Sequence, residues 1–271
     1  MPNSGSPAEP GALVRHSSWE IYRRVIGALL IRELITRYGR NNIGFLWLFV
    51  EPALFIIIVT IIRGFVRTTM GHSVPIFAFA LTGYASLLLW RNCASRGIGA
   101  VKANRALLFH RQVTIVDIFT ARMILEVAAI TTAVAGLALA LWAFGLLEPP
   151  EDVIQFLFGW MLLAWFAIGL GFTLGGLSEK WEVVGRLWSP LSYILMVNSG
   201  AFYLLQIFPE HVRNAMLWVP MLNAVEYMRD AWFGSTFTAY YDLNYLILFN
   251  VGLSIVGFSL VRQVAFDSSD E

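Results

Sequence analysis

The sequence places one carboxylate in an unusual position, because Glu51 directly precedes Pro52 inside a long apolar run. In a bilayer, a charged side chain costs roughly 3 kcal/mol or more unless it meets a partner, polar backbone or water. Pro52 removes the helical hydrogen bond to the carbonyl of Leu48 and bends the helix at that point. Glu51 could therefore brace the distorted turn or line a pathway through the membrane, and bracing is the preferred interpretation.

Aromatic side chains near this pair, and others further along, could bind sugar. Pyranose rings present apolar C–H faces that stack on aromatic rings, and Asn or Tyr side chains can bond the hydroxyl groups. The candidates for such a substrate path lie in two apolar runs: Trp47, Phe49 and Phe55 in the first, and Tyr193, Asn198, Phe202 and Tyr203 in the second. For each of them, packing or contact with lipid is at least as good an interpretation.

Enzyme signatures are missing from the sequence. It has no GxxxxGK[ST] phosphate loop, so it cannot use ATP by that route, and it has no HExxH or GxSxG pattern. A membrane enzyme acting on lipid-linked sugars stays open, with Glu51, Asp117 and Glu126 as candidate acids that do not gather on one apolar run. Cys93 is the only cysteine, which excludes a disulfide framework and a cysteine-based metal site. We expect no cofactor or metal on this chain.

The elements that would position these residues are membrane helices. The chain has 271 residues, of which 58% are hydrophobic and only 14% are charged, and the apolar residues are gathered in long runs. A helix needs about 20 apolar residues to cross about 30 Å of hydrocarbon. We therefore predict an all-α membrane protein with six transmembrane helices, at residues 43–62, 74–90, 113–147, 153–177, 187–208 and 243–261.

Shorter segments flank these spans. Residues 19–38 carry aromatic and apolar residues at helical spacing with arginines between them, which predicts an amphipathic helix in the membrane interface. The loop after the second span has an apolar pattern among basic residues and predicts a short amphipathic helix. Residues 206–232 hold two apolar pieces broken by prolines, which predicts re-entrant helices before the last span. Residues 1–18 are expected to be a disordered tail, and residues 263–271 an acidic one.

The distribution of Lys and Arg predicts the orientation. They gather in the N-terminal segment, in the loops after the second and fourth spans, and after the sixth, whereas the loop after the third span is acidic. Because cytoplasmic loops carry the excess of Lys and Arg, both termini are predicted to lie in the cytoplasm. The formal net charge of +1 hides this asymmetry and argues against a nucleic-acid partner.

Three runs carry a resemblance to a known family: RYGRNNIGFLWLFVEPALF, RGIGAVKANRALLFHRQV and LWVPMLNAVEYMRDAWFG. Together with six spans and an amphipathic start, they resemble the ABC-2 type exporter permeases, and most of all the permeases of capsule polysaccharide exporters in Gram-negative bacteria. The resemblance covers residues 19–262, which would form one transmembrane domain in the inner membrane. Pro220-Met221-Leu222-Asn223 stands where the family usually has an Asn-Pro pair, and we expect this difference to shift a bend without changing the function.

The resemblance implies a homodimeric permease subunit that is not itself an enzyme. A separate ATP-binding subunit would bind ATP and Mg²⁺ and would contact a coupling helix through Ile98, Val101, Arg105, Leu108, Phe109 and Arg111. The re-entrant helices would close the outer end, with Trp218, Pro220, Asn223, Glu226 and Arg229 as gate residues. The implied cargo is a long acidic lipid-linked polysaccharide, passed on to periplasmic and outer-membrane export proteins. O-antigen, teichoic acid or a drug are alternative cargoes.

The basic N-terminal helix would form part of the gate in such a permease. An exporter of a polyanion would benefit from arginines near its entrance, and the candidates that would join the substrate path are Arg24, Arg32, Arg37 and Arg40. The same arginines are explained equally well by the positive-inside rule and by attraction to anionic lipid.

Overall fold

The structure is a computed structural model that describes residues 18–38, 47, 49–58, 61, 75–108 and 113–267. Within these residues the secondary structure is helical throughout and contains no strand, which confirms the predicted all-α class. In chain order the helices are α1 (Ser18–Tyr38), an unlabelled helix (Phe49–Ile58), α3 (Ile76–Gly97), α4 (Ala100–Asn104), η1 (Arg105–Leu107), α5 (Ile115–Ala143), α6 (Val153–Lys180), α7 (Glu182–Asn198), η2 (Leu205–Ile207), α8 (Glu210–Met216), α9 (Pro220–Phe233), η3 (Gly234–Thr236) and α10 (Leu243–Asp267).

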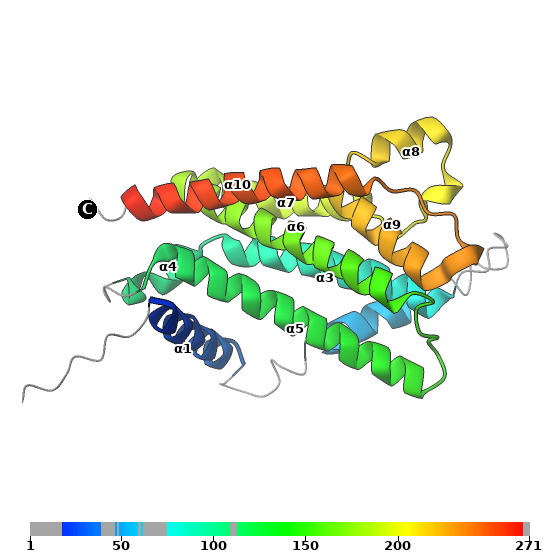
Figure 1. Cartoon of the computed structure of the whole chain (residues 1–271), viewed down its shortest axis with the longest axis horizontal. Helices are drawn as coiled ribbons and strands as arrows, with labels where there is room; N and C mark the ends of the chain where they lie inside the picture. The colour runs from blue at the N-terminus through cyan, green and yellow to red at the C-terminus, as the bar shows by residue number, and fades with distance from the viewer. Residues whose placement is uncertain are drawn as a thin grey trace, which may run out of the picture.

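Three of the described helices, α5, α6 and α10, are long and apolar enough to cross a membrane. α5 and α6 match the predicted spans at 113–147 and 153–177 to within four residues, whereas α10 begins at the predicted residue 243 but continues past the predicted end at 261 to Asp267, into the predicted acidic tail. α6 lies in the middle of the bundle, where α3, α9 and α10 all pack against it (Figure 1). The fold is thus organised around a central apolar helix.

Glycines set the closest helix contacts. A Cβ atom at Gly97 of α3 would overlap the carbonyl group of Gly171 in α6, and one at Gly176 would lie 2.8 Å from the Cβ atom of Leu260 in α10. In lipid no hydrophobic driving force brings helices together, so their association depends on close packing. Small residues allow the helix backbones to approach closely. The contacts of α6 with α3 and α10 therefore depend on residues without side chains.

The described helix ends have local causes. Thr114 caps α5 in a reciprocal capping box with Asp117, and the Asp152 side chain accepts a hydrogen bond of 2.8 Å from the backbone N–H of Gln155 at the start of α6. These bonds satisfy amides that the first helical turn leaves unpaired. Asp117, one of the candidate acids, is therefore a capping residue.

The predicted span at 187–208 differs from the structure, because α7 begins at Glu182 and ends at Asn198. Gly200 follows with a left-handed φ of 78°, and the carbonyl group of Tyr203 accepts a hydrogen bond of 2.8 Å from Arg229. Backbone groups after Asn198 thus find hydrogen-bond partners outside a helix. The residues there are still apolar, and for this reason the predicted span extended too far. α3 in turn runs past the predicted boundary at residue 90 to Gly97.

The helix predicted at 19–38 is observed as α1. Ile26 and Leu29 are buried against Ala121 of α5, while Ile31 and Ile35 on the opposite side are 63% and 60% exposed. α1 is therefore packed on the bundle along one face and presents apolar side chains on another, as an interfacial helix does.

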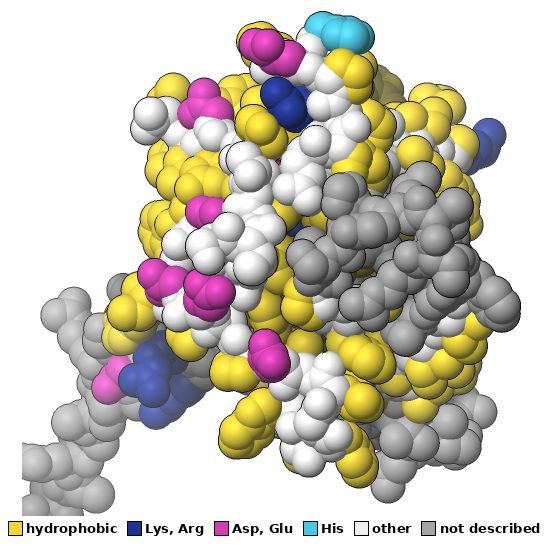
Figure 2. Space-filling model, turned by 90° about the vertical axis from the view of Figure 1, so that its right-hand side faces the viewer, with side chains coloured by type: hydrophobic (Ala, Val, Ile, Leu, Met, Phe, Trp, Pro, Cys, Tyr) yellow, Lys and Arg dark blue, Asp and Glu magenta, His cyan; other side chains and the backbone are white. Residues whose placement is uncertain are grey.

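The bundle has two distinct ends. Figure 1 places α4 and the end of α10 at one of them, and α8 and α9 at the other. Lys180 at the end of α6 donates a hydrogen bond of 2.5 Å to Gln263 of α10, so the turn between α6 and α7 belongs to the first end as well. Figure 2 views the second end, where acidic side chains are spread among hydrophobic ones over the described part of the surface.

Candidate functional site

The carboxylate of Glu51 has a partner on another helix. The Tyr84 hydroxyl group of α3 donates a hydrogen bond of 3.2 Å to Glu51 Oε1. Phe55, one turn further along the helix Phe49–Ile58, stacks on the Tyr84 ring with centroids 3.8 Å apart, and Phe202 meets Phe55 edge-on at 5.8 Å. This arrangement supports bracing as the role of Glu51, while Leu48 and its carbonyl lie outside the described residues.

Tyr84 is a residue that sequence reasoning missed. It lies within an apolar run in which a tyrosine is ordinary, and only the packing of two helices brings it to Glu51. A single sequence contains no signal for such a contact.

The remaining sugar-path candidates are exposed on the surface, hydrogen-bonded to nearby backbone, or packed against another helix. Trp47 and Tyr193 are 57% and 53% exposed, and the Arg91 guanidinium lies 5.0 Å above the Tyr193 ring. Asn198 donates to the carbonyl group of Ile194, and the Tyr203 hydroxyl group donates to the carbonyl group of Asn198. Phe49 lies against α5, where a Cβ atom at Gly136 would be 2.9 Å from its ring. Of the predicted set, the structure thus brings together Glu51, Phe55 and Phe202.

At the first end of the bundle, α1 is tied to α4 and α5 by charged groups. Arg32 donates a hydrogen bond of 2.9 Å from Nη1 to Oδ1 of Asn104, the last residue of α4. Glu33 forms an ion pair of 3.1 Å with Arg122 of α5. A charge-assisted hydrogen bond and an ion pair thus link α1 to both helices.

Two charged residues that lie one turn apart on α5, Arg122 and Glu126, each have a partner on another helix. Arg122 bonds Glu33 and also donates to the carbonyl group of Arg96 at 3.1 Å, whereas Glu126 lies 3.7 Å from Arg96 Nε. These charges join α1, α3 and α5.

The short helix predicted after the second span is observed as α4 followed by η1. Val101 and Leu108 pack against a buried cluster that includes Ile118 and Phe119, and Ile98 ends α3 half-buried. Arg105 is exposed in η1 and thus accessible to a partner. Phe109 and Arg111 lie outside the described residues. Of the four N-terminal arginines, Arg24 is exposed, Arg32 bonds Asn104, and the side chain of Arg37 and all of Arg40 lie outside the described part.

At the second end, α9 carries a buried polar face that bonds three surrounding segments. Asn223 donates to the carbonyl group of Leu217 at 2.8 Å and accepts from the backbone N–H of Asp242 at 2.7 Å. Glu226 accepts from the backbone N–H groups of Leu205 and Tyr240 at 3.5 and 3.4 Å.

Arg229 completes this face. Its Nη1 lies 3.8 Å from Glu226 Oε1, its guanidinium lies 4.3 Å above the Phe79 ring, and both members of the ion pair are fully buried. Burial raises the pKa of the Glu226 carboxyl to about 7, against the opposing effect of Arg229. The predicted gate residues Asn223, Glu226 and Arg229 are therefore brought together in a buried, hydrogen-bonded core at the second end of the bundle.

The other two predicted gate residues lie at the edge of this core. Pro220 occupies the first position of α9, where a missing N–H costs nothing. Trp218 is 74% exposed, and its carbonyl group accepts a hydrogen bond from the Tyr245 hydroxyl group at 2.7 Å.

The three candidate acids of a membrane enzyme do not meet. Glu51 bonds Tyr84, Asp117 caps α5 at Thr114, and Glu126 lies beside Arg96. Among the described residues no group of three His, Cys, Asp or Glu could hold a metal ion. The geometry thus offers helix-to-helix links and aromatic contacts, with no assembled catalytic group in the described part.

Comparison with known proteins agrees with this arrangement. The chain is 43% identical to the capsule polysaccharide export inner-membrane protein CtrC of Neisseria meningitidis serogroup B, over 93% of this chain and 96% of that protein. It is 38% identical to the capsule polysaccharide export inner-membrane protein BexB of Haemophilus influenzae, over 91% and 93%. It is 30% identical to the polysialic acid transport protein KpsM of Escherichia coli, over 91% and 95%. The model of the ABC-2 type transporter family matches residues 24–233, so the chain belongs to the ABC-2 type transporter family.

Proposed function

We propose that this chain is the permease subunit of an ATP-driven exporter that moves capsular polysaccharide across the bacterial inner membrane. The observation that carries the proposal is the likeness to proteins named for capsule polysaccharide export, which extends over more than nine-tenths of the chain. The name of KpsM specifies polysialic acid, an acidic glycan, which favours an acidic cargo here too. These names favour a capsular glycan over O-antigen, teichoic acid or a drug.

The proposed topology has six spans: the helix that contains Phe49–Ile58, α3, α5, α6, α7 and α10. Two observations support it. One end of the bundle holds the α4 segment, the turn between α6 and α7, and the end of α10. Six spans require this, because every second connection of the chain must lie on the same side of the membrane. The opposite end includes the exposed acids of the connection between α5 and α6, and the basic end would face the cytoplasm with both termini.

Energy would come from a separate ATP-binding subunit that holds ATP and Mg²⁺. The sequence has no phosphate loop of its own. In this proposal two copies of the permease form a dimer, and each copy binds one ATP-binding subunit. The exposed α4–η1 segment, with Arg105 at its surface, is the proposed contact.

The proposed mechanism follows the charged links of the first end. Closure of the ATP-binding subunits would push α4, and the bond from Asn104 to Arg32 would transmit this movement to α1. The Glu33–Arg122 ion pair would carry it onward to α5. The first span, braced by the Glu51–Tyr84 bond, would then move with α1 and open the path for the glycan, which periplasmic and outer-membrane export proteins would receive.

The ATP-binding subunit provides the direct test. The chain should co-purify with it, and the charge reversals Arg105→Glu and Arg111→Glu should weaken that association and reduce polymer at the cell surface. Arg213→Glu is the matched control, because Arg213 lies on α8 at the opposite end. Unchanged assembly and unchanged export in both variants would refute the coupling assignment. Polymer export in the absence of any ATP-binding subunit would refute the function itself.

A further inference from the structure

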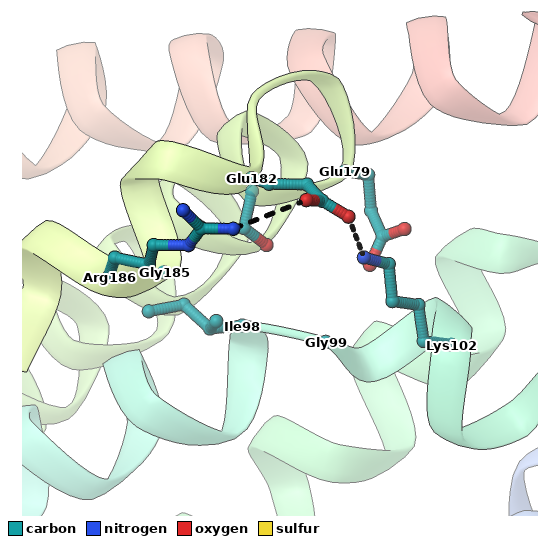
Figure 3. A pocket seen from close by; sticks show the side chains of 8 residues that line it. Ile98, Gly99, Lys102, Glu179, Glu182, Gly185 and Arg186 are labelled. Atoms are coloured by element: carbon teal, nitrogen blue, oxygen red, sulfur yellow. Dashed lines mark hydrogen bonds and ion pairs between the residues drawn. The ribbon is translucent and has the colours of Figure 1, made fainter.

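A cavity of about 250 Å³ lies between the α4 segment and the turn that joins α6 to α7 (Figure 3). Ile98, Gly99 and Lys102 line one side of it, and Glu179, Glu182 and Arg186 are among the residues of the other. Sites for small molecules usually enclose about 300–1,000 Å³. This cavity is smaller, and its volume suits a single side chain supplied by another protein.

The rim of the cavity is held by charges that can exchange partners. Glu182 lies 3.1 Å from Lys102 and 3.8 Å from Arg186, so that two cations share one carboxylate. All three side chains are more than half exposed, at 64% for Lys102, 70% for Glu182 and 80% for Arg186. Exposed ion pairs contribute only about 0–1 kcal/mol. The rim can therefore open to admit a partner at little cost.

Glu179 carries one carboxylate oxygen that lacks a donor among the described residues. The charge of Lys102 and a hydrogen bond from the backbone N–H of Val101 act on the Glu179 carboxylate, but they leave its other oxygen unbonded. Its Oε1 atom is buried and has no hydrogen-bond donor within the described residues. Figure 3 shows the Glu179 side chain beside the cavity, where it and Glu182 both reach toward the ammonium end of Lys102. A buried carboxylate oxygen without a donor loses its hydration and gains nothing in return. An incoming cationic donor would satisfy it.

The surface next to the cavity suits a protein partner. Trp181 and Val183, which flank Glu182 in the sequence, are 59% and 57% exposed. Interfaces between proteins typically place a charged or aromatic anchor in a pocket and surround it with contacts that exclude water. A partner anchored in the cavity would cover both of these apolar side chains.

We propose that this cavity receives an arginine side chain of the ATP-binding subunit, with Glu179 as its carboxylate partner. The inference rests on the proposed function and adds the turn between α6 and α7 to the surface that the subunit contacts. Arginine fits better than lysine, because its planar guanidinium carries five donors and can bond Glu179 and Glu182 at the same time. The subunit would thus hold α4 and the α6–α7 turn together.

The test measures the affinity between the full chain in nanodiscs and its own purified ATP-binding subunit. Glu179→Gln keeps the shape of the side chain and removes its charge, and should weaken binding about tenfold, the loss of one charge-assisted hydrogen bond. Glu210→Gln, the same change on exposed α8 at the opposite end, should leave binding unchanged. Glu179→Lys should abolish binding, and one Arg→Glu or Lys→Glu variant of the subunit should restore it.

Two results would overturn the inference while leaving the proposed function intact. In the first, the Glu179→Gln variant has the wild-type melting temperature and binds the subunit with wild-type affinity. The other is a loss of affinity in Lys102→Met as large as in Glu179→Gln, since the rim ion pair would then be the determinant. Failure of the unaltered chain to bind the subunit at all would overturn both the inference and the proposed function.

Discussion

Replacement of Arg229 should destabilise the protein far more than replacement of an exposed cation in a similar ion pair. Arg229 is fully buried with Glu226, donates to the carbonyl group of Tyr203 at 2.8 Å, and lies over Phe79. Arg229→Met retains the apolar contact with the ring and removes the charge and its donors. Glu226 would then be a buried carboxylate without its nearest cation.

The expected magnitude follows from burial. Removing one member of a buried ion pair costs roughly 3–5 kcal/mol, because the other charge is left desolvated and unpaired. Lys102→Met disrupts a pair that is 64% and 70% exposed and should cost at most about 1 kcal/mol. The free energies of unfolding can be compared by titrating SDS into mixed micelles and following far-UV circular dichroism. Both variants should be measured in the same lipid and detergent mixture.

A double variant sharpens the measurement. Glu226→Gln removes the charge that Arg229→Met leaves unpaired, so the two changes together should cost less than the sum of the single changes. If Arg229→Met unfolds at the same SDS fraction as Lys102→Met, the guanidinium is not what holds the segment after α7 to α9. Strict additivity in the double variant would refute the pairing with Glu226.

Three further predictions concern other parts of the molecule. Burial raises the pKa of Glu226 from 4.5 to about 7, so that, as the pH rises between these values, the unfolded chain loses this proton before the folded chain does. The free energy of unfolding should therefore fall between about pH 5 and pH 7. Glu226→Gln should flatten this dependence when melting curves at about pH 5 and pH 8 are compared. Asn104→Ala removes the acceptor of the hydrogen bond from α1, worth roughly 1.5–3 kcal/mol with a charged donor, and should lower the amount of surface polymer while the ATP-binding subunit still co-purifies. Gly97→Ala should cost roughly 1–3 kcal/mol in an SDS titration, because its methyl group would overlap the carbonyl group of Gly171, whereas Gly252→Ala, with open space around it, should cost nothing.

The long helices could be predicted because run length alone decides them. An apolar run that is long enough to cross the hydrocarbon forms a helix whatever its neighbours are, since the backbone has no other way to pair its polar groups in lipid. The spans at α5, α6 and α10 follow from this rule. Helix ends within apolar sequence do not, and the end of α7 at Asn198 is an example. There the backbone is bonded by Arg229, which lies on a later helix.

The candidate site could likewise be predicted only in part. The sequence by itself determined the membrane class, the helical segments at both ends and the residue types gathered there, because composition and periodicity are properties of consecutive residues. Only the tertiary structure decided which partner each charge has: Tyr84 for Glu51, Asn104 for Arg32, and Glu33 for Arg122. These partners lie on different helices, and the close glycine contacts that set the helix positions leave no periodic trace in a single sequence. The same packing turned three predicted gate residues of α9 into a buried, hydrogen-bonded core.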